Sequence, residues 1–398
     1  MKKLLFILIS AALLVSCQNE KLSDLSKVAT EVPEVSSQII PGKYVVVYNT
    51  IGIKKAARIA SLSGNSIITP ENVVTMTKEI LSSSNIQMRA PELAYATALK
   101  GVAIELTDAE AAELAKSPAV KGVYPDMMVN FGLPEVSING KPATPAAQST
   151  PWGITRIGGS TDGTGKTAWI IDTGIDMDHP DLKVDQTKGK NFVTTTATPD
   201  DDNGHGTHCA GIVAALNNGQ GVIGVAAGAT VVPVKVHNKR GSGAYSAIIA
   251  GVDYVAANAK AGDAVNMSLG GPIYTPLDDA IIAMAAKGIK VAIAAGNESQ
   301  DTNNVSPGHI NGTNIYTISA MGTGDLWASY SNFSNPPIDF CAPGSSIYST
   351  YKGGAYATLS GTSMATPHVC GLLLLGNIGT DGYVKNDPDG NADPIAHK

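Results

Sequence analysis

The stretch TAWIIDTG, residues 167–174, is a short apolar strand followed by a glycine turn. Further apolar segments of similar length come later, and longer segments with helical periodicity separate them. The apolar segments lie at 230–236, 263–269, 290–297 and 315–321, and the helical ones at 205–216, 243–259 and 275–287. Short apolar strands alternating with helices are typical of a mostly parallel sheet covered on both faces, so we predict a three-layer α/β fold.

Polar side chains end two of these strands. Asp172 ends the first strand, and Asn297 ends the segment 290–297. In a parallel α/β sheet, ligands bind outside the carboxyl ends of the strands. We therefore expect both side chains to face a functional site.

A third candidate is Ser363, in SGTSMATPHVCG at residues 360–371. It precedes an apolar helical segment, and Pro367 falls where the first turn of a helix tolerates proline. Such a serine either caps the helix, which is its commonest use, or acts as a nucleophile. A nucleophilic serine needs a base and a third group that orients the base. His205, in DDNGHGTHCAG, and Asp172 supply these two groups.

The segments around Asp172, His205 and Ser363 occur in that order and resemble the subtilisin-like serine proteases over about residues 151–375. HGTHCAG, with its cysteine, is most similar to the proteinase K branch. The resemblance implies acyl transfer to Ser363, with Asn297 as oxyanion-hole donor and no cofactor for the chemistry. It also implies polypeptide substrates that bind extended between two edge segments, formed by Gly241, Ser242, Gly243, Ser268, Leu269 and Gly270.

The same resemblance implies a structural calcium ion. Asp339, in IDFCAPG, matches the family's calcium-binding aspartate, and the carbonyl groups of Thr313 and Ile315 would be its backbone partners. Carboxylate and carbonyl oxygens are ligands that suit calcium. We interpret the acidic run 200–202 as a solvated loop instead.

Residues 41–130 form a separate small α+β module. GKYVVVY alternates like a strand, and the segment from 100 to 126 indicates a strand, a helix capped near Thr107, and a second strand. This module resembles the ferredoxin-like inhibitory propeptide of the same family. We therefore expect it to be a partner of the peptidase domain, 149–398, and to be cut off within 131–148. A permanent accessory domain is the alternative.

The first residues, MKKLLFILISAALLVSC, have a basic start and a short apolar core, as targeting segments do. The end of this segment resembles a bacterial lipoprotein signal, which would be removed as residues 1–16 and leave a lipidated Cys17. Residues 17–40 would then tether the protein to a membrane until processing. An ordinary secretory signal is the alternative. The three other cysteines are an odd number, so a full disulfide framework is excluded.

The charge and the composition of the chain indicate which classes of partner it does not bind. The net charge is −6 and basic runs are absent, so nucleic acid is not expected to bind. The tail after Leu375 is rich in Gly, Asp and Pro, and we expect it to be irregular. The main hypothesis is an exported zymogen lipoprotein with endopeptidase activity. A catalytically silent surface lipoprotein that captures extended peptides is the alternative.

Overall fold

The computed structural model describes residues 36–131, 137–138, 147–194, 197–376 and 378–398. The lipoprotein signal, Cys17 and most of the expected processing linker lie outside these residues. Among the described residues, no helix combines the length and the apolar character needed to cross a membrane.

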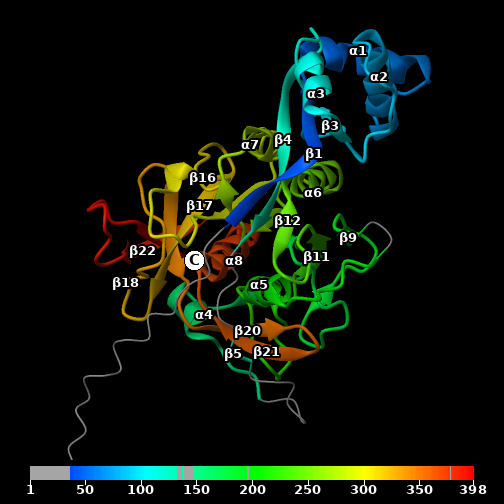
Figure 1. The fold of residues 1–398 in the computed structure, drawn as a ribbon. Coiled ribbons are helices and arrows are strands. Elements are labelled where there is room, and N and C mark those ends of the chain that lie inside the picture. The colour runs from blue at the N-terminus through cyan, green and yellow to red at the C-terminus, as the bar shows by residue number, and fades with distance from the viewer. Residues whose placement is uncertain (1–35, 132–136, 139–146, 195–196, 377) are drawn as a thin grey trace, which may run out of the picture. The chain divides into compact units, whose positions relative to one another are not determined.

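A large, mostly parallel sheet organises residues 149–398, the expected peptidase part (Figure 1). Its strand order is β22-β23-β19-β17-β15-β13-β7-β11-β8, with β18 also paired to β17 and β9 to β11. The pairs of β22 with β23 and of β18 with β17 are antiparallel. The bounds are β7 Thr167–Asp172, β8 Lys183–Val184, β9 Lys190–Asn191, β11 Thr230–Lys235, β13 Ala264–Met267, β15 Lys290–Ala294, β17 Ile315–Gly322, β18 Leu326–Trp327, β19 Ile338–Pro343, β22 Gly379–Tyr383 and β23 Pro394–His397. The predicted α/β class is confirmed.

Helices cover both faces of this sheet, which makes the three layers. The side chains of β7 alternate between the two faces, as the period of a strand requires. Ala168 and Ile170 pack in the core that contains α5 and α8, whereas Trp169 and Ile171 pack in the core that contains α6 and α7. The helices are α4 Trp152–Arg156, α5 His205–Ala214, α6 Tyr245–Asn258, α7 Thr275–Ala285 and α8 Thr362–Leu375, with a 3-10 turn at Thr302–Asn304.

Small sheets complete the peptidase part. The strand β12 (Ser242–Ala244) follows β11 and joins the sheet of the N-terminal module. The other short strands are β5 Ser137–Ile138, β6 Thr161–Asp162, β10 Ala226–Ala227, β14 Gly271–Pro272, β16 Val305–Ser306, β20 Ile347–Tyr351 and β21 Ala355–Leu359. The strand β5 lies inside the segment expected to be a processing linker and pairs with β21.

The N-terminal module is an antiparallel sheet with strand order β4-β1-β3-β2, as in a ferredoxin-like fold. One face carries its own core, which includes Val46 and Val102, under the helices. The other face, with Val45 and Val47, packs in the same core as α6 and α7. The elements are β1 Ser36–Tyr48, α1 Thr50–Leu62, α2 Pro70–Ser83, β2 Leu93–Tyr95, β3 Gly101–Glu105, α3 Asp108–Leu114 and β4 Val120–Asn130. We call this module, residues 36–131, the prodomain, after the expectation from the sequence.

Local sequence signals explain the prodomain helices. Thr107 accepts a hydrogen bond from the Glu110 amide, and the Glu110 carboxylate accepts one from the Thr107 amide, which is a capping box at the start of α3. Thr69 and Asn72 form the same arrangement before α2, and the Asn49 side chain caps α1. The sequence analysis found α3 but assigned neither α1 nor α2.

Two segments near the ends of the chain differ from their predicted structure. The C-terminal tail is not irregular, because β23 adds to the edge of β19 in parallel, with Cys341 opposite Ile395. An exposed sheet edge leaves backbone groups to be paired, and Ile395 is fully buried there. The expected tether, 17–40, overlaps β1, which begins at Ser36 because residues 36–39 pair with β4.

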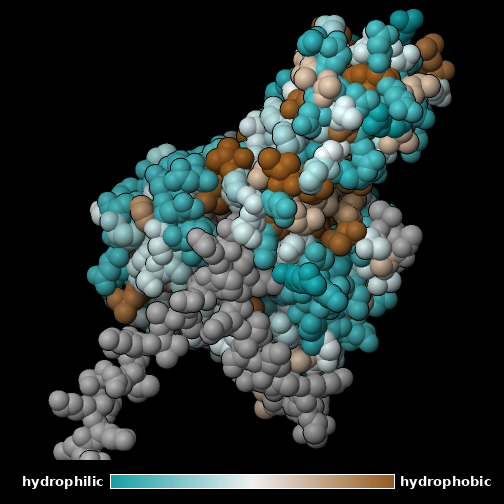
Figure 2. Space-filling model, viewed as in Figure 1, coloured by the Kyte–Doolittle hydropathy of each residue, from teal (hydrophilic) through white to brown (hydrophobic). Residues whose placement is uncertain are grey.

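Figure 2 shows a mostly hydrophilic face with small apolar patches. Exposed large apolar side chains are scattered over the described chain, among them Leu62, Ile67 and Tyr383. Scattered apolar exposure of this kind is ordinary for a folded protein and marks no interface by itself.

Candidate active site

Asp172 and His205 form a buried pair. Asp172 is the last residue of β7, and His205 is the first residue of α5. The His205 Nδ1 atom lies 2.8 Å from Asp172 Oδ1 and 3.0 Å from Oδ2. The His205 Nε2 atom is buried and has no hydrogen-bond partner. The carboxylate therefore fixes the proton on Nδ1, and Nε2 is left to accept a proton.

The electrostatics of this pair favour an imidazolium. Burial opposes charge on both groups, but their mutual attraction outweighs it. The pKa of His205 is raised above its ordinary value by Asp172, with a further contribution from Asp201. The pKa of Asp172 is lowered by His205. A base whose charged form is stabilised in this way suits proton transfer from a hydroxyl.

The start of α8 brings Ser363 to the same region. Ser363 is the second residue of the helix and is 8% exposed. Cys209, one turn after His205 on α5, lies with its Sγ 3.4 Å from the Ser363 carbonyl oxygen. The Ser268 hydroxyl donates to that oxygen as well, over 2.8 Å. The Cys209 contact joins α5 to the start of α8, and the Ser268 contact joins the end of the β13 segment to the same residue.

Asn297 lies in the same pocket as Ser363, at the end of the β15 segment. Its Oδ1 accepts from the Thr362 amide at 2.8 Å and from the Thr362 hydroxyl at 2.9 Å. This leaves the Nδ2 group to donate. The pocket lining also contains the predicted edge residues Ser268, Leu269 and Gly270.

The other predicted edge, Gly241 to Gly243, pairs with the last strand of the prodomain. Ser242 lies opposite Asn130 and Gly243 opposite Val129 in an antiparallel ladder. The Phe131 amide continues the ladder by donating to the Gly241 carbonyl over 3.3 Å. A Cβ on Gly243 would lie only 2.5 Å from the Val236 carbonyl oxygen, so glycine is required for this close approach. Phe131 then lines the pocket that holds Ser363 and Asn297.

Comparison with known proteins agrees with this arrangement. Residues 163–376 match the model of the subtilase family of peptidases, and residues 60–131 match the peptidase inhibitor I9 family. The chain belongs to the subtilase family. It is a serine endopeptidase made with an inhibitory propeptide, and therefore as a zymogen.

Relatives of this subtilase include secreted enzymes. It is 33% identical over 388 residues to the "Extracellular serine proteinase" of a Thermus species, covering 93% of this chain and 88% of that protein. It is 36% identical over 295 residues to the "Alkaline serine exoprotease A" of Vibrio alginolyticus, covering 71% of this chain and 53% of that protein. The crystal structure of a cold adapted subtilisin-like serine proteinase matches with a TM-score of 0.54 and 33% identity, covering 61% of this chain and 96% of that one.

Two of the predicted calcium residues of the subtilase, Asp339 and Ile315, lie on adjacent strands, and Thr313 lies in the turn before Ile315. Asp339 is in β19, which runs parallel to β17, the strand that begins at Ile315 just after Thr313. The Asp339 carboxylate accepts from the Thr317 amide at 2.9 Å. Burial raises the pKa of Asp339 to about 6. A half-buried carboxylate is a ligand type that suits a hard cation, and a bound cation would offset the cost of burying the charge.

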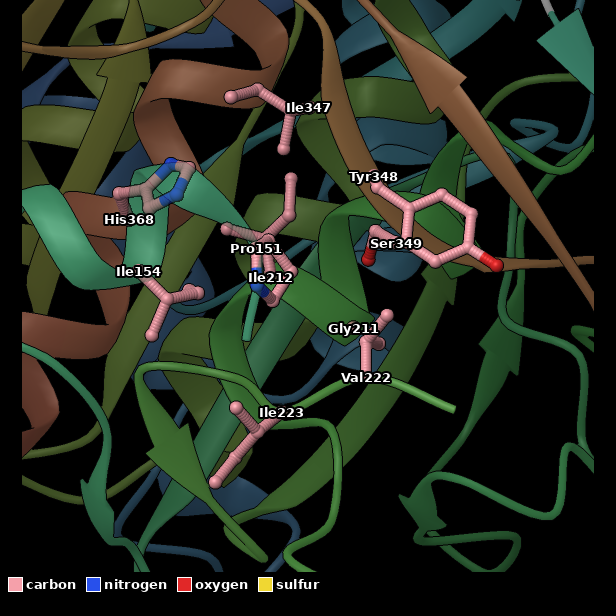
Figure 3. Close-up of a pocket in the computed structure, with 10 residues that line it drawn as sticks. All are labelled: Pro151, Ile154, Gly211, Ile212, Val222, Ile223, Ile347, Tyr348, Ser349 and His368. Carbon is pink, nitrogen blue, oxygen red and sulfur yellow. The ribbon is translucent and has the colours of Figure 1, made fainter. Parts of the chain in front are cut away.

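Three further histidines are structural. His208 Nε2 lies 3.1 Å from the carbonyl oxygens of Ile347 and Ala357, and burial lowers the pKa of His208 to about 3. His368 Nδ1 bonds the Met364 carbonyl in α8. Figure 3 shows His368 at the edge of a mostly apolar pocket. Ser363 and Asn297 do not line this pocket. His179 Nε2 lies 3.0 Å from the Ala355 carbonyl.

Sequence reasoning missed Asp201. The prediction of a solvated loop at 200–202 is wrong for Asp201, which is 5% exposed. Its carboxylate accepts from the Thr173 hydroxyl, from the Gly204 amide, and from both the amide and the hydroxyl of Thr207. Asp201 thus ties the residue after Asp172 to the first turn of the His205 helix. An acidic residue shortly before a helix was the available signal, since such residues satisfy free N–H groups there.

Proposed function

We propose that Asp172, His205 and Ser363 are the catalytic triad of this subtilase and that Asn297 is an oxyanion-hole donor. The observation that carries the proposal is the buried pair of Asp172 with His205 Nδ1, which leaves Nε2 unpartnered. Cys209, one turn further along the same helix, contacts the Ser363 carbonyl group. A second support is the single pocket shared by Ser363 and Asn297.

The reaction follows from these positions. His205 Nε2 takes the proton of Ser363 Oγ, and Oγ bonds to the carbonyl carbon of the substrate. The resulting oxyanion accepts from Asn297 Nδ2 and from the Ser363 amide at the helix N-terminus. His205 then gives its proton to the leaving amine, and the peptide bond breaks. Water releases the acyl group by the same steps in reverse order, while Asp172 stabilises the imidazolium.

The prodomain inhibits by occupying the substrate edge, in our proposal. The strand β4 takes the place of substrate on Ser242 and Gly243, and Phe131 lines the pocket of Ser363. Beyond Phe131 the chain continues into the segment 131–148, within which we expect the cut. Main-chain pairing tolerates many side chains, so extended polypeptides in general are expected as substrates.

Two finer features belong to the same proposal. The chain is a lipoprotein anchored through Cys17 in the cell envelope until processing separates the peptidase from the anchor. Calcium bound by Asp339 and the carbonyl groups of Thr313 and Ile315 stabilises the domain. A lipid label on the mature peptidase fragment would contradict the first feature.

The decisive experiment is the intact mass of the chain from Gln18 onward, compared with Ser363→Ala. The wild-type chain should split into a fragment that starts between residues 131 and 148, and the variant should stay whole. Ser329→Ala changes an exposed serine and should split like wild type. If wild type also stays whole, self-processing is refuted and the silent peptide-binding alternative gains support.

A further inference from the structure

His237 lies between the catalytic pair and the prodomain. Its amide donates to the Asp172 carbonyl over 3.2 Å, directly after the β11 segment. The side chain is buried, with the residue only 2% exposed, and its Nε2 atom has no hydrogen-bond partner. On one side the ring approaches Gly243, where a Cβ would come within 2.6 Å of it.

The other side of the His237 ring is covered by Phe131. The two ring centroids are 4.1 Å apart with an interplanar angle of 37°. The Phe131 backbone is held on the substrate edge by its bond to Gly241. A polypeptide that pairs with the same edge after the prodomain leaves would therefore place one side chain against His237, in the position of Phe131.

We propose that His237 is a specificity-determining residue that selects an aromatic substrate side chain at the position of Phe131. This inference rests on the proposed peptidase site. An aromatic ring covers the imidazole, as Phe131 does at a tilt of 37°, whereas a small side chain would leave the imidazole uncovered. Contacts between aromatic rings can stabilise beyond the area that they bury.

The charges around His237 do not supply a competing preference. The ionisable groups that interact electrostatically with the His237 side chain are Asp172 on β7, Lys235 on β11 and His205 on α5. An acidic substrate side chain at this position would approach the buried Asp172 carboxylate. A basic one would find Asp172 already engaged by His205. An apolar ring avoids both conflicts.

The test uses peptides with the prodomain sequence 124–131 followed by the linker sequence, which differ only at the position of Phe131. Wild-type mature enzyme at pH 8 should cleave the Phe and Tyr peptides with kcat/KM about tenfold above the Leu and Ala peptides. His237→Ala should reduce this ratio to about twofold. His397→Ala, which changes a histidine in β23, should keep the wild-type ratio.

Two outcomes would overturn the inference. Equal cleavage of the four peptides by wild type refutes it without any variant, so the test does not depend on how His237→Ala folds. An unchanged ratio in His237→Ala also refutes it. Labelling of Ser363 by a fluorophosphonate separates the two proposals. If Ser363 labels and the peptides are cut without preference, only the His237 assignment falls. If Ser363 does not label and no peptide is cut, both fall.

Discussion

One carboxylate of the peptidase holds a turn of the prodomain. Asp253, on α6, is 8% exposed. Its Oδ1 accepts from the amides of Thr97, Ala98 and Leu99 at 2.8, 2.7 and 3.2 Å. Its Oδ2 accepts from the Ala96 amide at 2.9 Å. Removing this charge should weaken the hold of the peptidase on its prodomain.

The size of the effect follows from the contacts. Hydrogen bonds to a charged group contribute about 1.5–3 kcal/mol each, and bonds to one acceptor are not additive. Asp253→Asn keeps Oδ1 but removes the charge and the acceptor of the Ala96 amide. We expect a loss of about 2 kcal/mol, which is about 30-fold in the dissociation constant. Asp253→Ala leaves all four amides without an acceptor. It should reduce the binding free energy of the prodomain by about 3 kcal/mol or more, which is over 100-fold in the dissociation constant.

The assay is the inhibition constant of the prodomain, measured on processed enzyme from each variant. Asp279→Asn is the matched control because it removes an ion pair with Lys121 from the same interface. Lys121 is 49% and Asp279 is 32% exposed, and exposed pairs contribute about 0–1 kcal/mol. The control should change the constant less than about fivefold. Equal effects of Asp253→Asn and Asp279→Asn would refute the reasoning.

Three further predictions concern the site and the proposed ion. Asn297→Leu should lower kcat about 10²–10³-fold, the loss known for subtilisin itself; an unchanged kcat per fluorophosphonate-labelled site would remove Asn297 from the oxyanion hole. Activity needs neutral His205 and falls as the pH drops through its raised pKa. Asp172→Asn should therefore move the acid limb of the kcat/KM profile to lower pH, and an unmoved limb would contradict the pairing. In chelator, Tm should fall as the pH rises from about 4 to about 6, because burial raises the pKa of Asp339 to about 6 and its charged form is destabilised. Calcium should reverse this loss in wild type but not in Asp339→Asn, and an equal response in both would exclude that residue.

The sequence predicted those features that depend on local pattern. The alternation of apolar strands and helices gave the α/β class, because each strand must bury both faces. The strand ends located Asp172 and Asn297, since the carboxyl ends of parallel strands meet at one edge. The capping residues located α3, because free N–H groups at a helix start need acceptors.

The sequence did not predict features that depend on contacts between residues far apart in the chain. The tail became β22 and β23 because β19 offers an open edge, and that edge exists only once the sheet is assembled. Asp201 is buried because the residue after Asp172 and the first turn of α5 meet around it.

The sequence by itself determined the order of the proposed catalytic residues, the central sheet and the presence of a prodomain. Only the tertiary structure decided that Phe131 stacks on His237 and that Asp253 receives the turn at residues 96–99. Both contacts join residues more than a hundred positions apart. Local propensity carries no information about such pairs, because their energy arises from surfaces that meet only after each domain has folded.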